Sequence, residues 1–476
     1  MMQKIFSLLF VLVPFVFVMT VHSQPWTNGN VVLSPNGRFL QHENGLPFFW
    51  LGDTGWRLFQ KLDRAETRIY LKDRKDKEFN VIQSMVVHAL PEENRYRDSA
   101  FVQNVMLTPY VTGGKDTNDA AQYDYWDHVE WVIDEAARNG LYMALVPIWG
   151  SALKQSDSPV SAAESYAAFL ANRFKQKPNI FWIVGGDIQG NIKQDFWETL
   201  GRTLKKLDPN HLITYHPYGR TQSSTWFHHS SWLDVNMFQS GHRRYDQDNS
   251  PKKYGEDNWR YILDDYTKVP AKPTLDGEPS YENIPQGLHD TTQPYWTAND
   301  VRRYAYWSVF AGACGHTYGN NSVMQMYRPD DPTVAYGARK YWNESLQDSG
   351  SVQMKYLKHL ILSRPYVERT FDDSLIVNNS GTRYNYIVAM RGTNYLMAYT
   401  YTGQKINIQM GRIAGTRVNA WWFNPRNGDA RMIGLFKNEG VSQFVPPVIQ
   451  TVGDDWILVL DNSDINFPPP GGSSKL

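Results

Sequence analysis

Two carboxylates lie far apart in the chain, and each one closes an apolar segment. Asp187 follows a run of apolar and aromatic residues and two glycines in FWIVGGDIQG. Glu278 ends the segment PTLDGE, 91 residues further on. Cleavage of a glycosidic bond needs such a pair, because one carboxyl group protonates the leaving oxygen while the other attacks the anomeric carbon or activates water. Asp187 and Glu278 are therefore the candidate catalytic residues.

The spacing of the pair fits a barrel of alternating strands and helices. An uninterrupted apolar run is typical of a strand buried on both faces, and barrel enzymes keep their chemistry at the carboxyl ends of the strands. At roughly 30 residues per strand–helix unit, the 91 residues correspond to three units, from strand four to strand seven. A separation of roughly 5 to 5.5 Å between the two groups would indicate a retaining mechanism.

Each member of the pair also has a structural interpretation. Asp187 fits a turn or N-cap residue after two glycines, and Glu278 fits an exposed turn in Gly-Glu-Pro. Asp276 and Glu282 are close rivals of Glu278 for the second catalytic position. The joint placement at one rim favours the catalytic interpretation.

Ten further residues fall at predicted strand ends, where polar side chains bind sugar hydroxyls and aromatic rings stack on sugars. These candidate substrate-binding residues are Asp53, Trp56, His88, Trp149, Tyr215, His216, Gln239, His242, His316 and Tyr318. The histidines raise the alternative of a metal hydrolase. The chain has no H-E-x-x-H motif and no His-x-His on the first strand, so we expect neither metal ligands nor a cofactor.

The elements that must position these residues form a regular series. The predicted strands are 48–56, 80–90, 141–150, 179–186, 211–219, 232–242, 272–283 and 315–320. The predicted helices are 63–79, 125–139, 161–176, 194–207, 259–267, 300–313 and 352–362. Alternation of this kind predicts parallel strands with helical crossovers. The expected fold class is α/β, a (β/α)8 TIM barrel followed by a small C-terminal β-sandwich.

The β-sandwich follows from a change in the sequence pattern. From about Phe371, short β-rich runs alternate with Gly, Asn and Pro turns, and no helical period appears. The predicted organisation is a signal peptide at 1–23, a barrel with an N-terminal hairpin at 24–368, the sandwich at 369–466 and a flexible tail at 467–476.

The N-terminus predicts export. Lys4 precedes an apolar run from Ile5 to Met19, and small and polar residues follow it, as in a secretory signal peptide. The run is short for a membrane span, so no span is expected after cleavage, and the expected location is secreted or periplasmic. Cys314 is the only cysteine and lies in the apolar segment FAGACG, so no internal disulfide is expected.

Composition narrows the class of partner. The 48 basic and 48 acidic residues balance to zero net charge, which argues against a nucleic-acid partner. Aromatic residues reach 14%, with 17 Trp and 28 Tyr. This aromatic content fits a large core and also fits surfaces that stack on sugar rings.

Four segments carry a resemblance to a known family. They are LPFFWLGDTGW (46–56), FWIVGGDIQG (181–190), TLDGEPSYE (274–282) and GHTYGNNSVM (315–324). The chain resembles glycoside hydrolase family 140, the apiosidase-like family that was formerly a domain of unknown function. The C-terminal segment WWFNPRNGDA (421–430) is similar to a β-rich domain family named for collagen binding.

The resemblance implies a retaining barrel glycosidase in which Asp187 is the acid/base and Glu278 the nucleophile. It also implies an apiosyl linkage in plant pectin, in a rhamnogalacturonan II side chain, so the expected partner is a plant cell-wall oligosaccharide or polysaccharide. Many related barrels carry Asn-Glu at the end of strand four, whereas this chain has Gly-Asp. The alternatives are a non-catalytic glycan- or matrix-binding protein, or a glycosidase for a different plant or host glycan.

Overall fold

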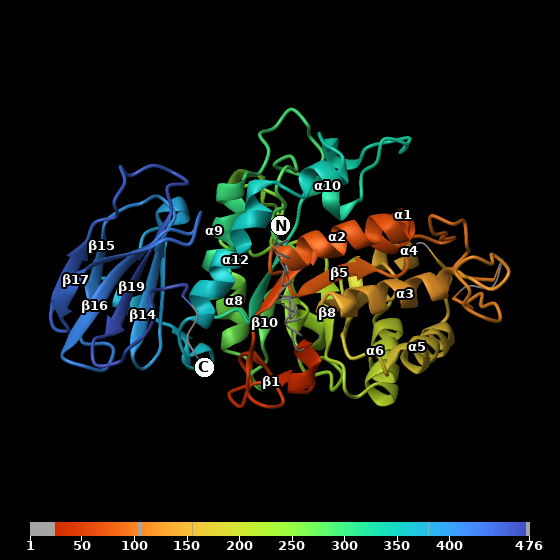
Figure 1. Cartoon of the computed structure of the whole chain (residues 1–476), viewed down its shortest axis with the longest axis horizontal. Coiled ribbons are helices and arrows are strands. Elements are labelled where there is room, and N and C mark those ends of the chain that lie inside the picture. The colour runs from red at the N-terminus through yellow and green to blue at the C-terminus, as the bar shows by residue number, and fades with distance from the viewer. Residues whose placement is uncertain (1–23, 103–106, 155, 379, 473–476) are drawn as a thin grey trace, which may run out of the picture.

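The structure, a computed structural model, describes residues 24–102, 107–154, 156–378 and 380–472. The predicted signal peptide lies outside these residues. The described chain forms a barrel and, beside it, a smaller antiparallel β part at the left of the view (Figure 1).

Eight parallel strands form the barrel sheet, which confirms the predicted fold class. Their order is β8-β7-β6-β5-β4-β11-β10-β9, and a bridge between Thr214 and Val235 joins the two ends of that order. The strands are β4 (Trp50–Thr54), β5 (Val81–Met85), β6 (Tyr142–Val146), β7 (Ile180–Ile188), β8 (Ile213–Pro217), β9 (Asn236–Phe238), β10 (Thr274–Asp276) and β11 (Gly315–Tyr318).

Helices surround this sheet, as the alternation predicts. The longer helices are α2 (Arg64–Asp76), α3 (Tyr125–Arg138), α5 (Val160–Phe174), α6 (Gln194–Leu207), α8 (Trp259–Tyr266), α9 (Ala298–Phe310) and α12 (Ser349–Leu362). Short helices fill the connections: α1 (Leu58–Lys61), α4 (Gly150–Lys154), α7 (Ser224–Phe227), α10 (Asn321–Met324) and α11 (Trp342–Ser345).

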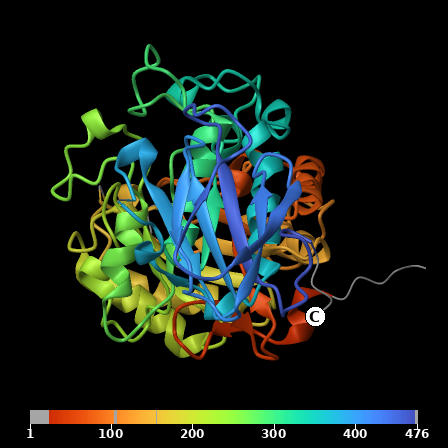
Figure 2. The same cartoon turned by 90° about the vertical axis from the view of Figure 1, so that its left-hand side faces the viewer.

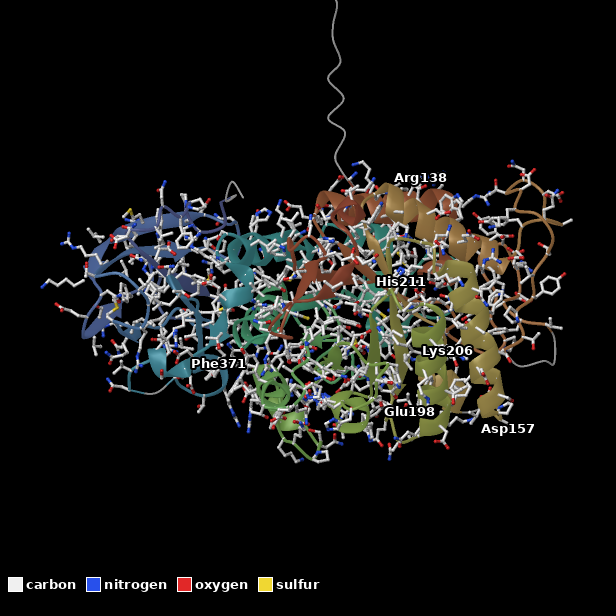
Figure 3. All side chains as sticks on the ribbon, turned by 90° about the horizontal axis from the view of Figure 1, so that it is seen from below. Arg138, Asp157, Glu198, Lys206, His211 and Phe371 are labelled. Atoms are coloured by element: carbon white, nitrogen blue, oxygen red, sulfur yellow. The ribbon has the colours of Figure 1, made fainter. Side chains whose placement is uncertain are left out.

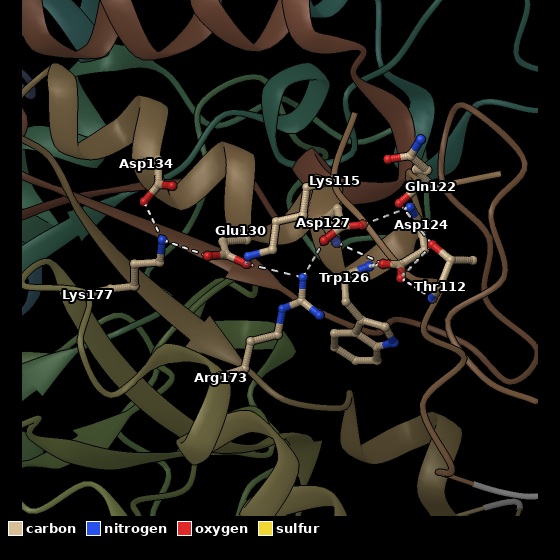
Figure 4. Close-up of polar contacts among 10 residues, drawn as sticks. All are labelled: Thr112, Lys115, Gln122, Asp124, Trp126, Asp127, Glu130, Asp134, Arg173 and Lys177. Carbon is tan, nitrogen blue, oxygen red and sulfur yellow. Dashed lines mark hydrogen bonds and ion pairs between the residues drawn. The ribbon is translucent and has the colours of Figure 1, made fainter. Parts of the chain in front are cut away.

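Local side-chain contacts fix where these helices begin and how they pack. The Asp124 carboxylate accepts from the backbone N–H groups of Trp126 and Asp127, which caps α3. Arg173 of α5 lies 2.6 Å from Asp127 and 3.1 Å from Glu130, so the two neighbouring helices are joined by ion pairs (Figure 4).

A small antiparallel sheet precedes the barrel, where the sequence predicts a hairpin. It consists of β1 (Val31–Leu33), β2 (Leu40–His42) and β3 (Pro47–Phe48). Phe48 packs against Tyr142 and Phe181 of the barrel strands, with ring centroids 5.2 and 5.8 Å apart. The sheet therefore closes the end of the barrel opposite the candidate catalytic rim.

The C-terminal part of the chain, from β12 to β19, consists of two antiparallel sheets. The larger sheet has the order β12-β13-β14-β19-β16-β17, and β15 pairs with β18 in the smaller one. Figure 2 shows these strands, in blue, in front of the barrel. The strands are β12 (Thr370–Phe371), β13 (Ile387–Arg391), β14 (Tyr395–Thr400), β15 (Ile406–Gln409), β16 (Arg417–Phe423), β17 (Ala430–Lys437), β18 (Val441–Phe444) and β19 (Trp456–Asn462).

The two halves share a buried interface. Tyr306 of α9 stacks on Tyr399 of β14 with ring centroids 5.0 Å apart, and Trp259 of α8 stacks on Tyr386 at 4.2 Å. One continuous apolar cluster runs from the barrel interior through α9 into the large sheet. Figure 3 shows Phe371, at the entry to the sandwich, well separated from His211 at the start of a barrel strand.

The segment after the last strand contacts this interface. The Phe467 ring lies 4.8 Å from the Arg364 guanidinium, and the Gly471 backbone N–H donates to Ser363 Oγ at 3.2 Å. Phe467 and Gly471 belong to the segment 467–476, whose flexibility stays a prediction from its composition. Cys314 is buried, with a free thiol. Within the described ranges, every helix is too short or too polar to cross a membrane.

Candidate active site

Two glycines aim Asp187 from the end of β7. Gly185, Gly186 and Asp187 have φ angles of 91°, 111° and 47°, all in the left-handed region. A Cβ at Gly186 would lie 2.3 Å from the Trp149 ring, and one at Gly185 would lie 2.7 Å from the His216 carbonyl oxygen. The strand continues through the glycines as an irregularity between Gly185 and Ile188. This bulge re-aims the carboxylate, as bulges beside active sites commonly do.

Glu278 follows β10 and is held by two histidines. His216 Nε2 lies 3.0 Å from Glu278 Oε2, and His242 Nε2 lies 3.0 Å from Oε1. The Tyr281 backbone N–H donates to His242 Nδ1 at 3.4 Å, so Nδ1 is the acceptor and the proton of a neutral His242 lies on Nε2. In this tautomer His242 donates to Glu278 Oε1 through Nε2.

The structure brings the two carboxyl groups together. One oxygen of Asp187, one of Glu278 and a ring nitrogen of His216 all lie within 4.8 Å of one another. This separation is close to the roughly 5 to 5.5 Å of retaining glycosidases and shorter than the roughly 6.5 to 9.5 Å of inverting ones. The fourth and seventh strands of the barrel, which are β7 and β10, therefore bring their carboxyl groups to the same rim, as predicted.

The environment drives the two pKa values apart. Burial, and then the negative charge of Glu278, raise the pKa of Asp187 to about 7. Burial alone would raise the pKa of Glu278, but hydrogen bonds from His216 and His242 outweigh it and lower that pKa to about 2. Burial opposes the charge on His216, but Glu278 outweighs it and raises the pKa of His216. At mildly acidic pH one carboxyl group holds a proton and the other is ionised.

Aromatic rings and a cavity surround the pair. Trp56 and Trp149 have ring centroids 5.1 Å apart, and each packs against His216, at 5.4 and 5.3 Å. Trp56 Nε1 donates to the Tyr281 hydroxyl at 3.0 Å. A cavity of about 320 Å³ adjoins Asp187, and Gln239 and His242 contribute to its wall. Gln239 also hydrogen-bonds Asp187.

Four of the predicted rim residues lie on the wrong face of their strands. Asp53 accepts from the Tyr70 hydroxyl at 2.5 Å and lies 3.4 Å from Arg74 Nε, between the sheet and α2. The Tyr318 hydroxyl donates to Glu282 at 2.5 Å in the same region. Tyr215 packs against Phe227 and donates to the Ile188 carbonyl.

The fourth, His316, is fully buried and lies two residues before Tyr318, on the same face of β11. Because side chains alternate along a strand, residues one position from the correct register face the helices instead of the barrel interior. The substrate-binding prediction is wrong for Asp53, Tyr215, His316 and Tyr318. The His88 backbone N–H donates to Glu92 at 2.6 Å, and burial lowers the pKa of its imidazole to about 4.

The rivals of Glu278 have other partners. Asp276 accepts from Ser240 Oγ at 2.6 Å and from Asn258 Nδ2 at 3.0 Å, on the opposite face of β10. Glu282 accepts from the Gly350 backbone N–H at the start of α12. Both are structural carboxylates, so neither competes with Glu278.

Two residues near the pair escaped the sequence analysis. Tyr281, in the segment SYE, contacts His242 at 4.7 Å between ring centroids. Burial raises the pKa of Tyr336, and so do the charges of Asp187 and Glu278, which places its phenol near both carboxyl groups. Tyr281 could have been found from its motif. Tyr336 lies in a long connection after β11, where no sequence period marks it.

The pair also belongs to a possible ligand set for a metal. Asp187, His216 and Glu278 present three ligand atoms within 4.8 Å of one another. His242 Nε2 already lies 3.0 Å from Glu278 Oε1, and His216 Nε2 lies 3.0 Å from Oε2, so both carboxylate oxygens have an imidazole partner at hydrogen-bond distance. The arrangement is accounted for by an ionised carboxylate between two donors.

Comparison with known proteins identifies the family. The model of the apiosidase-like catalytic domain matches residues 34–368, which is most of the chain. The chain belongs to the apiosidase-like family. Residues 371–461 match a second family described as "Putative collagen-binding domain of a collagenase".

Solved structures agree with the assignment. One described as a glycoside hydrolase is 45% identical over 94% of this chain and all of that one, with a TM-score of 0.88. A family 5 glycoside hydrolase from Bacteroides vulgatus is 43% identical over 95% of this chain and 98% of that one, with a TM-score of 0.89. A search of curated proteins found no match. This apiosidase-like protein is a glycoside hydrolase with a family 5-like barrel.

Proposed function

We propose that this protein is a retaining glycosidase that cleaves an apiosyl linkage in plant pectin, within a rhamnogalacturonan II side chain. The observation that carries the proposal is the pair of carboxyl groups within 4.8 Å of each other, with pKa values driven in opposite directions. The match to the apiosidase-like catalytic domain supports the choice of sugar.

The geometry supports a double displacement. In the first step, ionised Glu278 attacks the anomeric carbon while Asp187 gives its proton to the departing glycosidic oxygen, which leaves as an alcohol. The product is a glycosyl ester on Glu278. In the second step, ionised Asp187 takes a proton from water, and the resulting hydroxyl attacks the anomeric carbon and releases Glu278. The net configuration at that carbon is retained.

The residues around the pair have separate tasks in this mechanism. His216 and His242 each place a donor on one oxygen of Glu278, which keeps it ionised and fixes its orientation. Trp56 and Trp149 form an aromatic floor beside His216, on which the sugar ring packs. The apolar run that follows Lys4 supports export, so we place the enzyme outside the cell or in the periplasm.

The test is cleavage of rhamnogalacturonan II fragments, followed by the appearance of reducing ends. The wild-type enzyme releases them, Glu278→Gln does not, and the exposed-site control Glu164→Gln behaves as wild type. Proton NMR of the first product shows the retained anomer. Activity that survives EDTA argues against the metal alternative. Tight glycan binding without cleavage across a broad pectin panel would instead support a binding protein.

A further inference from the structure

A second cavity lies among the connections that follow three barrel strands. Its volume is about 220 Å³, and no described residue lines both this cavity and the one beside Asp187. Its walls come from α1 after β4, the loop after β5 and the connection after β11. These connections leave the carboxyl ends of their strands, so the cavity lies at the catalytic rim, on strands other than those of Asp187 and Glu278.

Most of the charged side chains that line this cavity are cations. The described lining contains four cations and one carboxylate, which are Lys61, Arg95, Arg97, Arg328 and Asp331. Lys61 lies 2.5 Å from Asp331. Asp330, outside the lining, is shared by Arg95 at 2.9 Å and Arg328 at 3.0 Å. Three of the four cations therefore have a carboxylate partner.

The fourth cation, Arg97, is exposed and forms no ion pair with the residues that the structure describes. Glu66 is a second partner of Arg328. The four lining cations thus pair with three carboxylates in total, which are Asp331, Asp330 and Glu66. The excess positive charge attracts an anion into the cavity.

The backbone that carries Arg97 is held by Asn94, which also lines the cavity. Asn94 Oδ1 accepts from the backbone N–H groups of Tyr96 and Asp98, and its Nδ2 donates to the Asp98 carboxylate. Arg97 itself has a φ of 68°, in the left-handed region that few residues other than glycine adopt. The guanidinium is therefore presented from a fixed turn at the edge of the cavity.

A buried hydrogen-bond acceptor belongs to the same lining. Gln60 is 5% exposed, and its Nε2 donates to the carbonyl oxygens of Met85 and Val86 and to the Tyr125 hydroxyl. These three acceptors fix the orientation of the amide. Its Oε1 has no hydrogen-bond partner among the described residues. Because buried polar atoms are normally paired, this oxygen favours a ligand that brings a donor, such as a hydroxyl group.

Size and an exposed ring narrow the class of ligand further. A volume of about 220 Å³ is below the roughly 300 to 1,000 Å³ of sites for drug-sized molecules, so the cavity suits a single sugar residue. Tyr96, next to Arg97 in the chain, is 37% exposed and gives a sugar ring a face to pack against. A cation, an acceptor and an aromatic face together fit a sugar that carries a carboxylate.

We propose that this cavity is a non-catalytic site for an acidic sugar residue, whose carboxylate binds Arg97 and whose hydroxyl group donates to Gln60 Oε1. The inference goes beyond the proposed function, because no residue of this cavity takes part in the reaction. A guanidinium offers two parallel N–H donors to a carboxylate, which a neutral sugar or a methyl ester cannot match in charge. A glycan bound here stays at the rim while the catalytic pair acts on another of its residues.

The test is a ligand-observed NMR titration at low salt with D-glucuronate, a free sugar acid that has no glycosidic bond to cleave. Its methyl ester is the neutral comparison. Wild-type protein should bind the acid more tightly by about 10-fold, the low end for a hydrogen bond to a charged group. Arg97→Gln should lose this difference and Arg97→Lys should keep part of it. The control Arg202→Gln, which removes an exposed arginine from α6, should keep all of it.

The contrary results are equally specific. Equal affinities of wild-type protein for acid and ester, or a preference that Arg97→Gln leaves unchanged, overturn the proposal. Acetate or inorganic phosphate that binds as tightly as glucuronate would show a site for small anions and overturn the choice of a sugar. None of these measurements depends on cleavage, so failure of the proposed reaction would leave the test of this site intact.

Discussion

Buried charges are arranged in opposite ways at the barrel–sandwich interface and at the candidate active site. At the interface two buried arginines pair with carboxylates: Arg364 lies 2.7 Å from Asp461, and Arg302 lies 2.8 Å from Asp455. At the active site two carboxyl groups and the His216 imidazole lie within 4.8 Å of one another. The first arrangement satisfies both ions, and the second leaves one carboxyl group protonated.

The difference separates stability from reactivity. A buried ion pair that loses one partner leaves an uncompensated charge in a dry environment, so its removal destabilises the fold. A buried pair of like charges stores an unfavourable interaction that is relieved by a proton, and this proton is then available for transfer. Mutations at the interface should therefore lower the free energy of unfolding, whereas mutations at the active site should lower kcat.

The largest effect is expected at the nucleophile. Glu278→Gln keeps the shape and the hydrogen-bonding oxygen but cannot attack the anomeric carbon, so kcat falls by about 10⁴-fold or more. The melting temperature stays within a few degrees of wild type, because His216 can lose its proton once the charge of Glu278 no longer raises its pKa. Steady-state kinetics together with calorimetry checks both statements. If Glu278→Gln lost activity because the protein unfolded, Glu278 would be a structural carboxylate like those of the interface.

The acid is the next most sensitive position. Asp187→Asn cannot donate a proton, so kcat/KM falls by about 10²- to 10⁴-fold on substrates with poor leaving groups. Substrates with good leaving groups, such as aryl glycosides, need little protonation and lose much less. Equal losses on the two kinds of substrate would show that Asp187 is not the acid.

An interface carboxylate should behave in the reverse manner. Asp461→Asn leaves the buried Arg364 guanidinium without its partner, and we expect a loss of about 3 to 5 kcal/mol in the free energy of unfolding. The folded fraction keeps wild-type kcat, because Asp461 lies far from the reaction. Denaturant unfolding and activity per folded molecule measure the two effects. If fully folded Asp461→Asn had a lowered kcat, the interface would contribute to catalysis, and the separation of the two regions would be wrong.

The smallest effect is a pH-dependent gain in stability. The pKa of Asp187 is raised from 3.8 to about 7 in the folded state, so the folded protein binds this proton more tightly than the unfolded chain. Wild-type stability should fall as the pH rises from about 4 through 7, and the cost should persist above 7. Asp187→Asn lacks this cost, so it should melt a few degrees above wild type at pH 8 and not at pH 4. If the melting temperatures of the two proteins depended on pH in the same way, the raised pKa of Asp187 would be contradicted.

The sequence predicts where the barrel strands lie in the chain. It predicts less well which side chains at the strand ends face the barrel interior and which face the helices. Apolar runs such as IFWIV locate β7, and all eight barrel strands lie where such runs predict them. The choice between neighbours at a strand end is harder. His216 contacts Glu278 while Tyr215 packs outward against Phe227. A boundary error of one residue reverses the face, so Asp53, His316 and Tyr318 were misplaced by the same cause.

Other parts of the chain had no usable pattern. The edge strand β17 is half exposed, and β18 follows it in the chain. Both lack a clear alternation of apolar and polar residues, and neither was predicted as a strand. The segment SLIV (374–377), one of the β-rich runs after Phe371, begins within the 3-10 turn Asp373–Leu375. The bulge at Gly185 and Gly186 was predicted only as a strand end. Its role became visible only from the neighbouring Trp149 and His216.

The central claim, that Glu278 forms a covalent bond to the sugar while Asp187 serves as its acid, is tested most directly by trapping that bond. An activated 2-deoxy-2-fluoro glycoside of the sugar that the enzyme releases should inactivate it, since fluorine slows the second step. Mass spectrometry of the digested protein should then show one glycosyl group on the peptide that contains Glu278. A glycosyl group on Asp276, on Glu282 or on no residue of an enzyme that still turns over the substrate would contradict the account.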